Sequence, residues 1–192
     1  ARDIADALQG VAAITTAGDV ALGVSLDEPP LGYRLQNPED AKSVMSMLLS
    51  GGGVAWKGIP IFDVQLPAGN DVELCISEGC EQGNATRLVY HPQRFTLGLG
   101  CARNADPADL WDLVQRSLKV NNIAHGAIAC VASIDLKADE PAILLVAQKL
   151  GVPFRVFTSV ELEAELPRLV NPSDVVYAEV GCHGVSEGAA LA

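Results

Sequence analysis

The sequence is short of aromatic residues, of basic residues and of long apolar runs, and each shortage excludes a class of partner. Only 5% of its 192 residues are aromatic, so few side chains could stack on the bases of single-stranded nucleic acid. Lysine and arginine number 13 against 24 aspartates and glutamates, and the net charge of −11 repels phosphate backbones and anionic membranes. No apolar run reaches the roughly 20 residues of a membrane-spanning helix. We therefore expect neither nucleic acid nor a membrane as a partner.

Cysteine is scarce as well, and its pattern does not suggest a disulfide framework. The five cysteines are odd in number and irregularly spaced, which favours reduced thiols and a cytoplasmic protein. Cys75 and Cys80 could meet across a tight turn, as a disulfide or as half of a metal site. No second pair of cysteines or histidines completes such a site, so we expect no metal ligands. Residues 1–4 also lack the basic-then-apolar pattern of a signal peptide.

What the sequence does contain is typical of a folded α/β protein built from two small domains. Apolar residues make up 49% of the chain and the mean hydropathy is +0.24, enough to form a buried core. We predict residues 1–19 as the end of a truncated amino-terminal domain, with a helix over residues 4–8 and a strand over 11–14. Residues 20–92 would form a middle α+β domain, and residues 93–192 a carboxyl-terminal α/β domain.

In the middle domain, one helix should precede a set of short strands. Asn37 and Pro38 have the form of a helix N-cap and first position, and apolar residues at helical spacing continue to the glycines at 51–53. Short apolar runs separated by glycine, proline and asparagine then predict strands joined by turns. These runs cover residues 54–56, 59–64, 72–76 and 87–90.

From residue 96 the pattern changes to alternating strands and helices. The apolar runs that predict strands cover residues 96–100, 127–134 and 153–157. Helices should follow from starts at Asp106, Glu140, Ser159 and Ser173. Short links between alternating strands and helices favour a βαβ-type, mostly parallel sheet with helices on both faces.

Three loops at the ends of these strands carry the residues that we expect to form a site. In open α/β sheets, ligands bind beyond the carboxyl ends of the strands. The first loop holds Gly98, Gly100, Cys101 and Arg103, the second Asp135, Lys137, Asp139 and Glu140, and the third Ser159. Strand alternation places Asp135 and Lys137 on the same side and Leu136 on the other. Asp139 and Glu140 have a second interpretation, as acidic residues that start the next helix.

The first loop matches only part of a dinucleotide-binding motif. Gly98-x-Gly100 is followed neither by the third glycine nor by an acidic residue about 20 positions further on. The glycines would let a ligand approach the backbone, and the guanidinium of Arg103 could bind a carboxylate. Alternatively, the two glycines only allow a helix to pack closely against the strand. Both interpretations stay open on the sequence alone.

A fourth segment, residues 181–188, places His183, Ser186 and Glu187 among glycines. Their side chains are suited to acid–base chemistry. A glycine that ends one helix, followed by Ser186 or Glu187 at the start of the next, explains the same pattern without chemistry. The sequence has none of the motifs of zinc hydrolases, phosphate-binding P-loops or serine-hydrolase elbows.

Several of these segments together resemble the cobalamin-biosynthesis family CbiG, whose carboxyl-terminal domain is shared with the CobE proteins. The similar blocks run nearly from end to end and include residues 13–19, 37–42, 98–103, 133–140 and 180–191. The ordered set of G-L-G-C, I-D-L-K-A-D-E and G-V-S-E is specific in combination. The resemblance implies an amino-terminal domain upstream of Ala1. In some members it also implies a fused precorrin-3B C17-methyltransferase, which would be a partner.

The resemblance further implies hydrolysis of cobalt-precorrin-5A, in which the ring-A δ-lactone of the macrocycle opens and acetaldehyde is released. Lys137 and the amides of residues 98–101 would then stabilise the oxyanion, and Asp135, Glu140 or Glu187 would be the base. Carboxylates of the substrate would be bound by cations such as Arg103, Lys137 and Arg155. The expected substrate-binding residues are Gly98, Gly100, Cys101, Arg103, Ser133, Ser159 and Gly184. The substrate itself would carry the cobalt, so no cofactor of the protein's own is expected.

The resemblance leaves a second function open. A non-catalytic module that binds or shuttles a corrinoid intermediate, serving a precorrin methyltransferase, would need basic groups and no general base. Whether the chain is an enzyme therefore depends on the carboxylates that face the macrocycle. For either function, we expect a local basic pocket on an acidic body.

Overall fold

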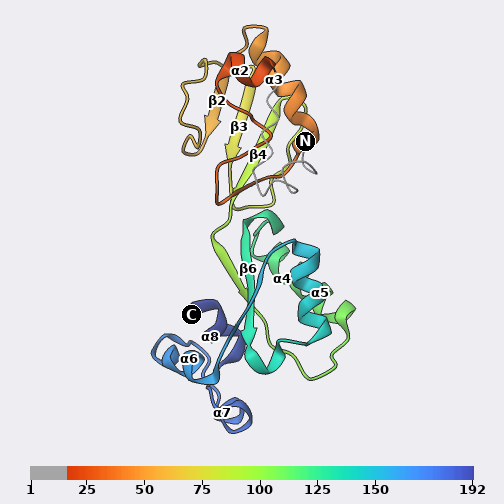
Figure 1. Cartoon of the computed structure of the whole chain (residues 1–192), viewed down its shortest axis with the longest axis vertical. Helices are drawn as coiled ribbons and strands as arrows, with labels where there is room; N and C mark the ends of the chain where they lie inside the picture. Colours follow the sequence, from red (N-terminus) through yellow and green to blue (C-terminus); the bar gives the residue numbers. More distant parts are fainter. Residues whose placement is uncertain (1–16) are drawn as a thin grey trace, which may run out of the picture. The chain divides into compact units, whose positions relative to one another are not determined.

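The computed structural model describes residues 17–192, which divide into two compact units (Figure 1). Unit 1 comprises the described residues up to Ser77 together with Glu81–Tyr90, and unit 2 comprises Glu78–Cys80 and His91–Ala192. The helix and strand predicted before residue 15 lie outside the described residues. Within residues 17–192, no helix is long and apolar enough to cross a membrane.

Unit 1 contains a sheet with the strand order β1-β4-β3-β2. The strands are β1 (Tyr33–Leu35), β2 (Val54–Lys57), β3 (Val72–Ile76) and β4 (Arg87–Pro92); the helices are α2 (Ala17–Leu22), the 3-10 turn η1 (Pro38–Asp40) and α3 (Ala41–Leu49). β2, β3 and β4 run parallel to one another. The apolar side of α3, with Val44 and Leu48, shares one core with Leu74 and Leu88 of the sheet.

Unit 1 departs from the sequence prediction in two places. The side chain of Asn37 makes no helix cap; it is buried, donates to the carbonyl of Arg87 and accepts the N–H of Val89, which ties the helix start to β4. The strand predicted over residues 59–64 is wrong, because this segment forms bends. Gly58 adopts φ of 105°, and Pro60, two residues later, has no N–H to donate to a strand neighbour.

Unit 2 is a parallel sheet in the order β5-β6-β7 with helices on both faces. Its strands are β5 (Phe95–Gly98), β6 (Ile128–Ile134) and β7 (Phe154–Phe157). Its helices are α4 (Pro107–Val120), α5 (Pro141–Leu150), α6 (Ser159–Ala164), α7 (Asp174–Val180) and α8 (Val185–Leu191), with 3-10 turns at His125–Ala127, Asp135–Lys137 and Leu166–Arg168. The prediction of an α/β chain with a mostly parallel, helix-covered sheet in its second part is confirmed (Figure 1).

The central strand β6 has a core on each of its faces. Val131 shares one core with Leu110 of α4 and Val146 of α5. Ala132 shares the other with Ala189 of α8. Because successive side chains of a strand point to opposite faces, a strand that is buried on both faces has a continuous apolar sequence. This explains why the run over residues 127–134 is easy to find in the sequence.

The predicted helix starts are present, with one shift. Asp106 accepts a backbone N–H at the start of α4, and Ser173 does the same at the start of α7. The cap of α6 is Thr158, so the prediction of Ser159 as the cap is wrong by one residue. Thr158 and Glu161 bond reciprocally in a capping box, which a cap at Ser159 could not form with Glu161.

Candidate functional site

A cavity of about 890 Å³ opens at the carboxyl ends of β5 and β6, within unit 2. Its volume falls within the range of small-molecule sites, roughly 300–1,000 Å³. The lining residues come from the loop after β5, the end of β6, the segment through α7 and the start of α8. They are Gly100, Cys101, Arg103, Ile134, Leu136, Lys137, Asn171, Ser173, Val175, Val176, Glu179, Val180, His183, Gly184, Val185, Ser186 and Glu187.

The loop after β5 and the turn after β6 contribute cations to this lining. Arg103 donates from Nη2 to the carbonyl of Leu136 at 2.8 Å, and its Nη1 lies 2.6 Å from Oδ1 of Asp139. The Nζ of Lys137 lies 3.4 Å from Oε2 of Glu140. The side chain of Arg103 is 52% exposed and that of Lys137 only 16%. Lys137 is therefore the more desolvated cation of the two.

Glu140 connects the same two loops from inside the protein. Its side chain has no exposed surface, and its Oε1 accepts the N–H of Asn104 at 3.1 Å. Its Oε2 lies 3.4 Å from Nζ of Lys137 and 3.6 Å from Nη1 of Arg103. Glu140 does not itself line the cavity. It supports the cationic wall from behind.

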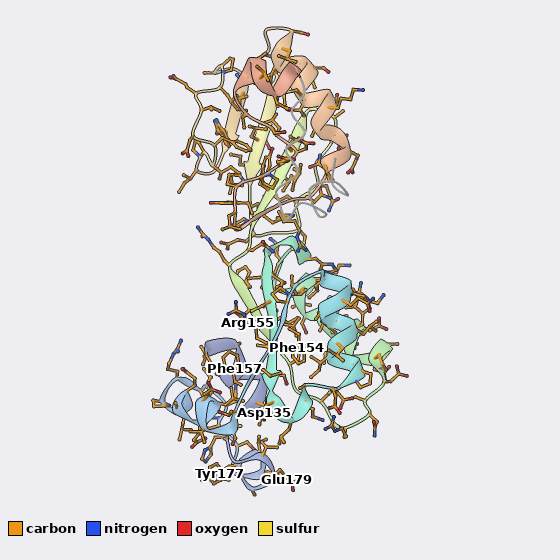
Figure 2. The ribbon with its side chains drawn as sticks, in the orientation of Figure 1. Asp135, Phe154, Arg155, Phe157, Tyr177 and Glu179 are labelled. Carbon is orange, nitrogen blue, oxygen red and sulfur yellow. The ribbon has the colours of Figure 1, made fainter. Side chains whose placement is uncertain are left out.

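The turn after β6 keeps Asp135 out of the cavity. Residues 135–137 form a 3-10 turn, so the prediction that Asp135 and Lys137 point to the same side of an extended chain is wrong. Side chains are about a third of a turn apart in such a helix and point in different directions. Asp135 is exposed at the end of β6 (Figure 2) and does not line the cavity. Arg155, within β7, does not line it either.

Three residues that we expected to bind substrate make structural contacts and do not line the cavity. Gly98 lies under α8, where a Cβ would meet the backbone of Ser186. The hydroxyl of Ser133 is buried and donates to the carbonyl of Leu99 at 2.7 Å. Ser159 is the first residue of α6. For Gly98, the alternative of close packing between strand and helix describes what the structure shows.

Glu187, on the opposite wall, has hydrogen bonds that fix the segment before α7. Its Oε1 accepts the N–H of Val170 at 2.6 Å, and its Oε2 accepts the N–H of Asn171 at 3.2 Å. Gly184, just before α8, lies against Leu169, and a Cβ at this glycine would be 3.0 Å from Cδ1 of that leucine. This wall is therefore closely packed around the predicted residues Gly184 and Glu187.

The sequence did not identify α7 as part of the site. Val175, Val176, Glu179 and Val180 line the cavity, and α7 has no buried residue. Figure 2 shows Tyr177 and Glu179 on this helix. The valines of this short helix could have indicated its role. A helix that covers no other surface needs no apolar side, so an apolar side suggests that the helix faces a core or a ligand.

His183 joins α6 to α7. Its Nδ1 lies 2.8 Å from Oε1 of Glu163, and its backbone N–H donates to the same carboxylate at 2.9 Å. Its ring stacks on Tyr177 at 4.4 Å between centroids, and its Nε2 lies 3.5 Å from Oδ1 of Asp174. The hydrogen bond with His183 lowers the pKa of Glu163. A carboxylate thus lies near each ring nitrogen, and His183, which lines the cavity, connects these helices.

The lining is not the basic pocket that we expected. The two cations in the lining, Arg103 and Lys137, are matched in number by two acidic residues, Glu179 and Glu187. Both cations also already have carboxylate neighbours. Much of the remaining lining consists of valine, leucine, isoleucine and glycine. Such walls suit a largely apolar ligand with polar groups at its edge.

All five cysteines lie within the described residues and are free thiols. The alternative of a disulfide between Cys75 and Cys80 is therefore wrong. Cys101 lines the cavity, where burial and then the charge of Glu140 raise the pKa of its thiol. Across residues 17–192, no group of three or more histidine, cysteine or acidic side chains could hold a metal ion.

Comparison with known proteins relates the cavity to one protein family. A family model described as cobalamin synthesis G C-terminus matches residues 95–192, which include all the lining residues. Protein CobE of a Sinorhizobium species is 48% identical to this chain over 97 aligned residues. The alignment covers 50% of this chain and 63% of that protein. A crystal structure of CobE, a protein from the cobalamin biosynthetic pathway, matches 52% of this chain and 70% of its own at 35% identity, with a TM-score of 0.49.

Two other relatives align with nearly the whole chain. The cobalt-precorrin-5A hydrolase of Priestia megaterium is 25% identical over 217 aligned positions, which cover 99% of this chain and 58% of that protein. The cobalt-precorrin-5A hydrolase of Salmonella typhimurium is 29% identical over 210 positions, which cover 98% of this chain and 60% of that protein. The chain thus spans about three fifths of the length of the curated relatives it matches.

Proposed function

Because this chain belongs to the cobalamin synthesis G C-terminus family, we propose that it acts in cobalamin biosynthesis as part of a cobalt-precorrin-5A hydrolase. It would supply a middle domain, residues 20–92, and a carboxyl-terminal domain, residues 93–192. The observation that carries the proposal is the cavity at the strand ends, whose lining lies wholly within the family segment. A corrin precursor is a wide ring, apolar over its faces, with carboxylates around its edge. Apolar walls with cations on one side fit such a ligand.

The proposed reaction has two steps. Water adds to the lactone carbonyl, the ring C–O bond breaks, and a carboxylic acid and a hydroxyl group result. A base then takes the proton of that hydroxyl, a C–C bond breaks, and the two-carbon fragment leaves as acetaldehyde while a proton returns to the ring carbon. In this proposal, Lys137 stabilises the oxyanion of the first step, together with the amides near Gly100 and Cys101, all of which line the cavity. Arg103 would bind a carboxylate at the edge of the ring.

The carboxylates differ in how well they could serve as the base. Asp135 is outside the cavity, and Glu140 lies behind its wall. Glu187 lines the cavity but accepts two backbone N–H bonds. Glu179, on α7, also lines the cavity. We therefore propose Glu179 as a candidate base beside Glu187, because a base must reach the proton that it removes.

A second candidate function is supported by the same observation. If the carboxylates of the cavity serve only structural roles, unit 2 is a corrinoid-binding or shuttling module, and a precorrin methyltransferase is the partner that we propose for it. The 48% identity to Protein CobE is confined to half of the chain, as expected if one unit can serve such a role without the other. In both cases the substrate carries the cobalt and the protein works in the cytoplasm.

The deciding experiment measures acetaldehyde, trapped as a hydrazone, after cobalt-precorrin-5A is mixed with this chain or with a protein of the relatives' full length. Release by this chain, abolished in Lys137→Met and retained in the surface variant Lys149→Met, supports hydrolysis within these residues. Release by the long protein alone makes this chain a partial site. Binding of the tetrapyrrole with no release from either protein favours the binding module, and neither binding nor release contradicts both functions.

A further inference from the structure

The buried carboxylate of Glu140 has no place in the proposed chemistry, although it is a costly group to bury. An ionised side chain without solvent is stable in a protein only when cations and hydrogen-bond donors surround it. Glu140 has both, since Oε1 accepts the N–H of Asn104 and Oε2 lies near Lys137 and Arg103. The residue therefore stays buried because it is bonded to the cationic wall of the cavity.

The direction of the side chain shows that Glu140 does not serve its own helix. It occupies the N-cap position of α5, yet its side chain makes no cap hydrogen bond there. The carboxylate instead reaches the loop after β5, where Asn104 adopts a left-handed φ of 57°. Glu140 thus joins the two strand-end loops that carry the cations.

Lys137 is the residue on which this arrangement has the largest effect. Its ammonium is largely buried and lines the cavity. Among residues 17–192, its one hydrogen-bond acceptor is Glu140, so two of its three N–H groups remain for a ligand. A lysine on a flexible four-carbon chain holds one position only if something fixes it. Arg103 depends less on Glu140, because it also bonds Leu136 and Asp139.

We propose that Glu140 is a positioning residue, which holds the ammonium of Lys137 at the cavity wall so that it can bind a carboxylate of the ligand. The proposal rests on the proposed function only in taking a corrin as that ligand. Glu140 acts through Lys137 and touches no reacting atom, which distinguishes it from a general base.

Removing the charge of Glu140 has two opposite effects on such a ligand. Loss of positioning weakens the contact with Lys137, whereas loss of a negative charge strengthens the long-range attraction of an anion. Salt separates the two, because at 0.5 M the screening length falls to about 4 Å and leaves mainly the short contact. Binding should therefore be compared at high ionic strength.

The first test is a double-mutant cycle of Glu140→Gln and Lys137→Met in 0.5 M salt. The probes are cobyrinic acid, a corrin with free carboxyl groups, and the same corrin with these groups methylated. We expect each single variant to weaken binding of the acid about tenfold, the loss of one hydrogen bond to a charged group. Adding Glu140→Gln to Lys137→Met should change the affinity less than about twofold. Binding of the ester should stay unchanged throughout.

Asp112→Asn is the control, because it removes the same charge from an exposed residue of α4 that does not line the cavity. At this salt concentration its long-range effect is screened, so the affinity should change less than about twofold. Additive effects in the cycle, equal losses for acid and ester, or an equal loss in Asp112→Asn would each overturn the positioning role.

A second test needs no ligand and uses the thiol of Cys101 as a reporter. The charges of Lys137 and Glu140 both act on its pKa, in opposite directions. Lys137→Met should raise that pKa in the wild-type chain, as read from the pH dependence of alkylation of the Cys101 peptide by mass spectrometry. In the Glu140→Gln background the same change should have little effect, because the lysine no longer stays beside the thiol. An equal rise in both backgrounds refutes the positioning role.

The two tests also separate failure of the proposed function from failure of the positioning role. If the wild-type chain binds neither corrin, the proposed function loses its support. The pKa of the Cys101 thiol still shows whether Glu140 positions Lys137.

Discussion

Replacing Gly98 by alanine separates a packing role from a binding role at the end of β5. A Cβ at this position would lie 2.9 Å from the carbonyl carbon of Ser186 and 3.0 Å from the nitrogen of Ala190, with the oxygen of Ser186 closer still. These atoms belong to the backbone of α8, so no side chain can rotate away. The helix has to move off the sheet and expose part of the core that contains Ala132 and Ala189.

The size of the effect follows from this geometry. Overpacking a rigid site costs roughly 1–3 kcal/mol, and a clash between two backbones belongs at the upper end, so we expect a loss of about 3 kcal/mol. For a unit of this size, that corresponds to a fall in melting temperature of roughly 10–20 °C. Gly100→Ala is the control, since its Cβ would be 3.6 Å from Cγ1 of Val185, an ordinary contact. Its stability should stay within about 0.5 kcal/mol of the wild type.

The assay can follow unit 2 alone. Trp56 and Trp111 are the two tryptophans of the chain, and Trp111 packs on the core of unit 2. Thermal unfolding monitored by Trp111 fluorescence in a Trp56→Phe background therefore reports on this unit. If Gly98→Ala melts within about 2 °C of the parent, or if Gly100→Ala melts equally early, the packing explanation is wrong. Weaker corrin binding by a fully stable Gly98→Ala protein would restore the binding role.

Three further outcomes are expected. Ser133→Ala leaves the buried carbonyl of Leu99 without its donor and should cost unit 2 about 1–3 kcal/mol in urea unfolding; an unchanged midpoint would contradict this. Glu187→Ala frees two amides before α7, whose hydrogen exchange should accelerate while that of α4 stays constant; equal rates in both proteins would count against it. The hydrogen bond from Cys75, then that from Lys57, lowers the pKa of Glu81 to about 2. The ionised form thus stabilises unit 1 above pH 4.5, and this stabilisation is lost as the pH falls toward 2. Glu81→Gln should flatten this decline in urea titrations read from Trp56, and parallel curves would refute it.

The fold of unit 2 could be predicted because its signals are local. The apolar run over residues 127–134 reflects a strand buried on both faces, and Asp106 and Ser173 are caps whose partners lie a few residues away. The prediction for unit 2 was wrong where the sequence pattern of a strand continues into a segment that forms a helical turn. Extending the strand alternation beyond residue 134 failed, because the chain turns into a 3-10 helix at Asp135.

The site was predictable in location but not in the role of each residue. Proximity to the strand ends brings Gly100, Arg103 and Lys137 to the cavity, as the topology requires. The direction of the Glu140 side chain depends on an amide 36 residues away in the sequence, which no local pattern reveals. The contribution of α7 was equally hidden, since its valines line a cavity and none of its residues is fully buried.

A cavity wall built from a helix without buried residues has a consequence for how the site exchanges its contents. The free energy of opening a segment depends on the apolar surface that the segment buries, and α7 buries little. Its ties include the N–H of Ser173 to the carbonyl of His183, the stacked ring of Tyr177, the amides held by Glu187, and Val180 against the core of Ala132 and Ala189. We therefore expect this wall to open at a lower free energy than the sheet unfolds. A rigid ring could then enter and leave without global unfolding.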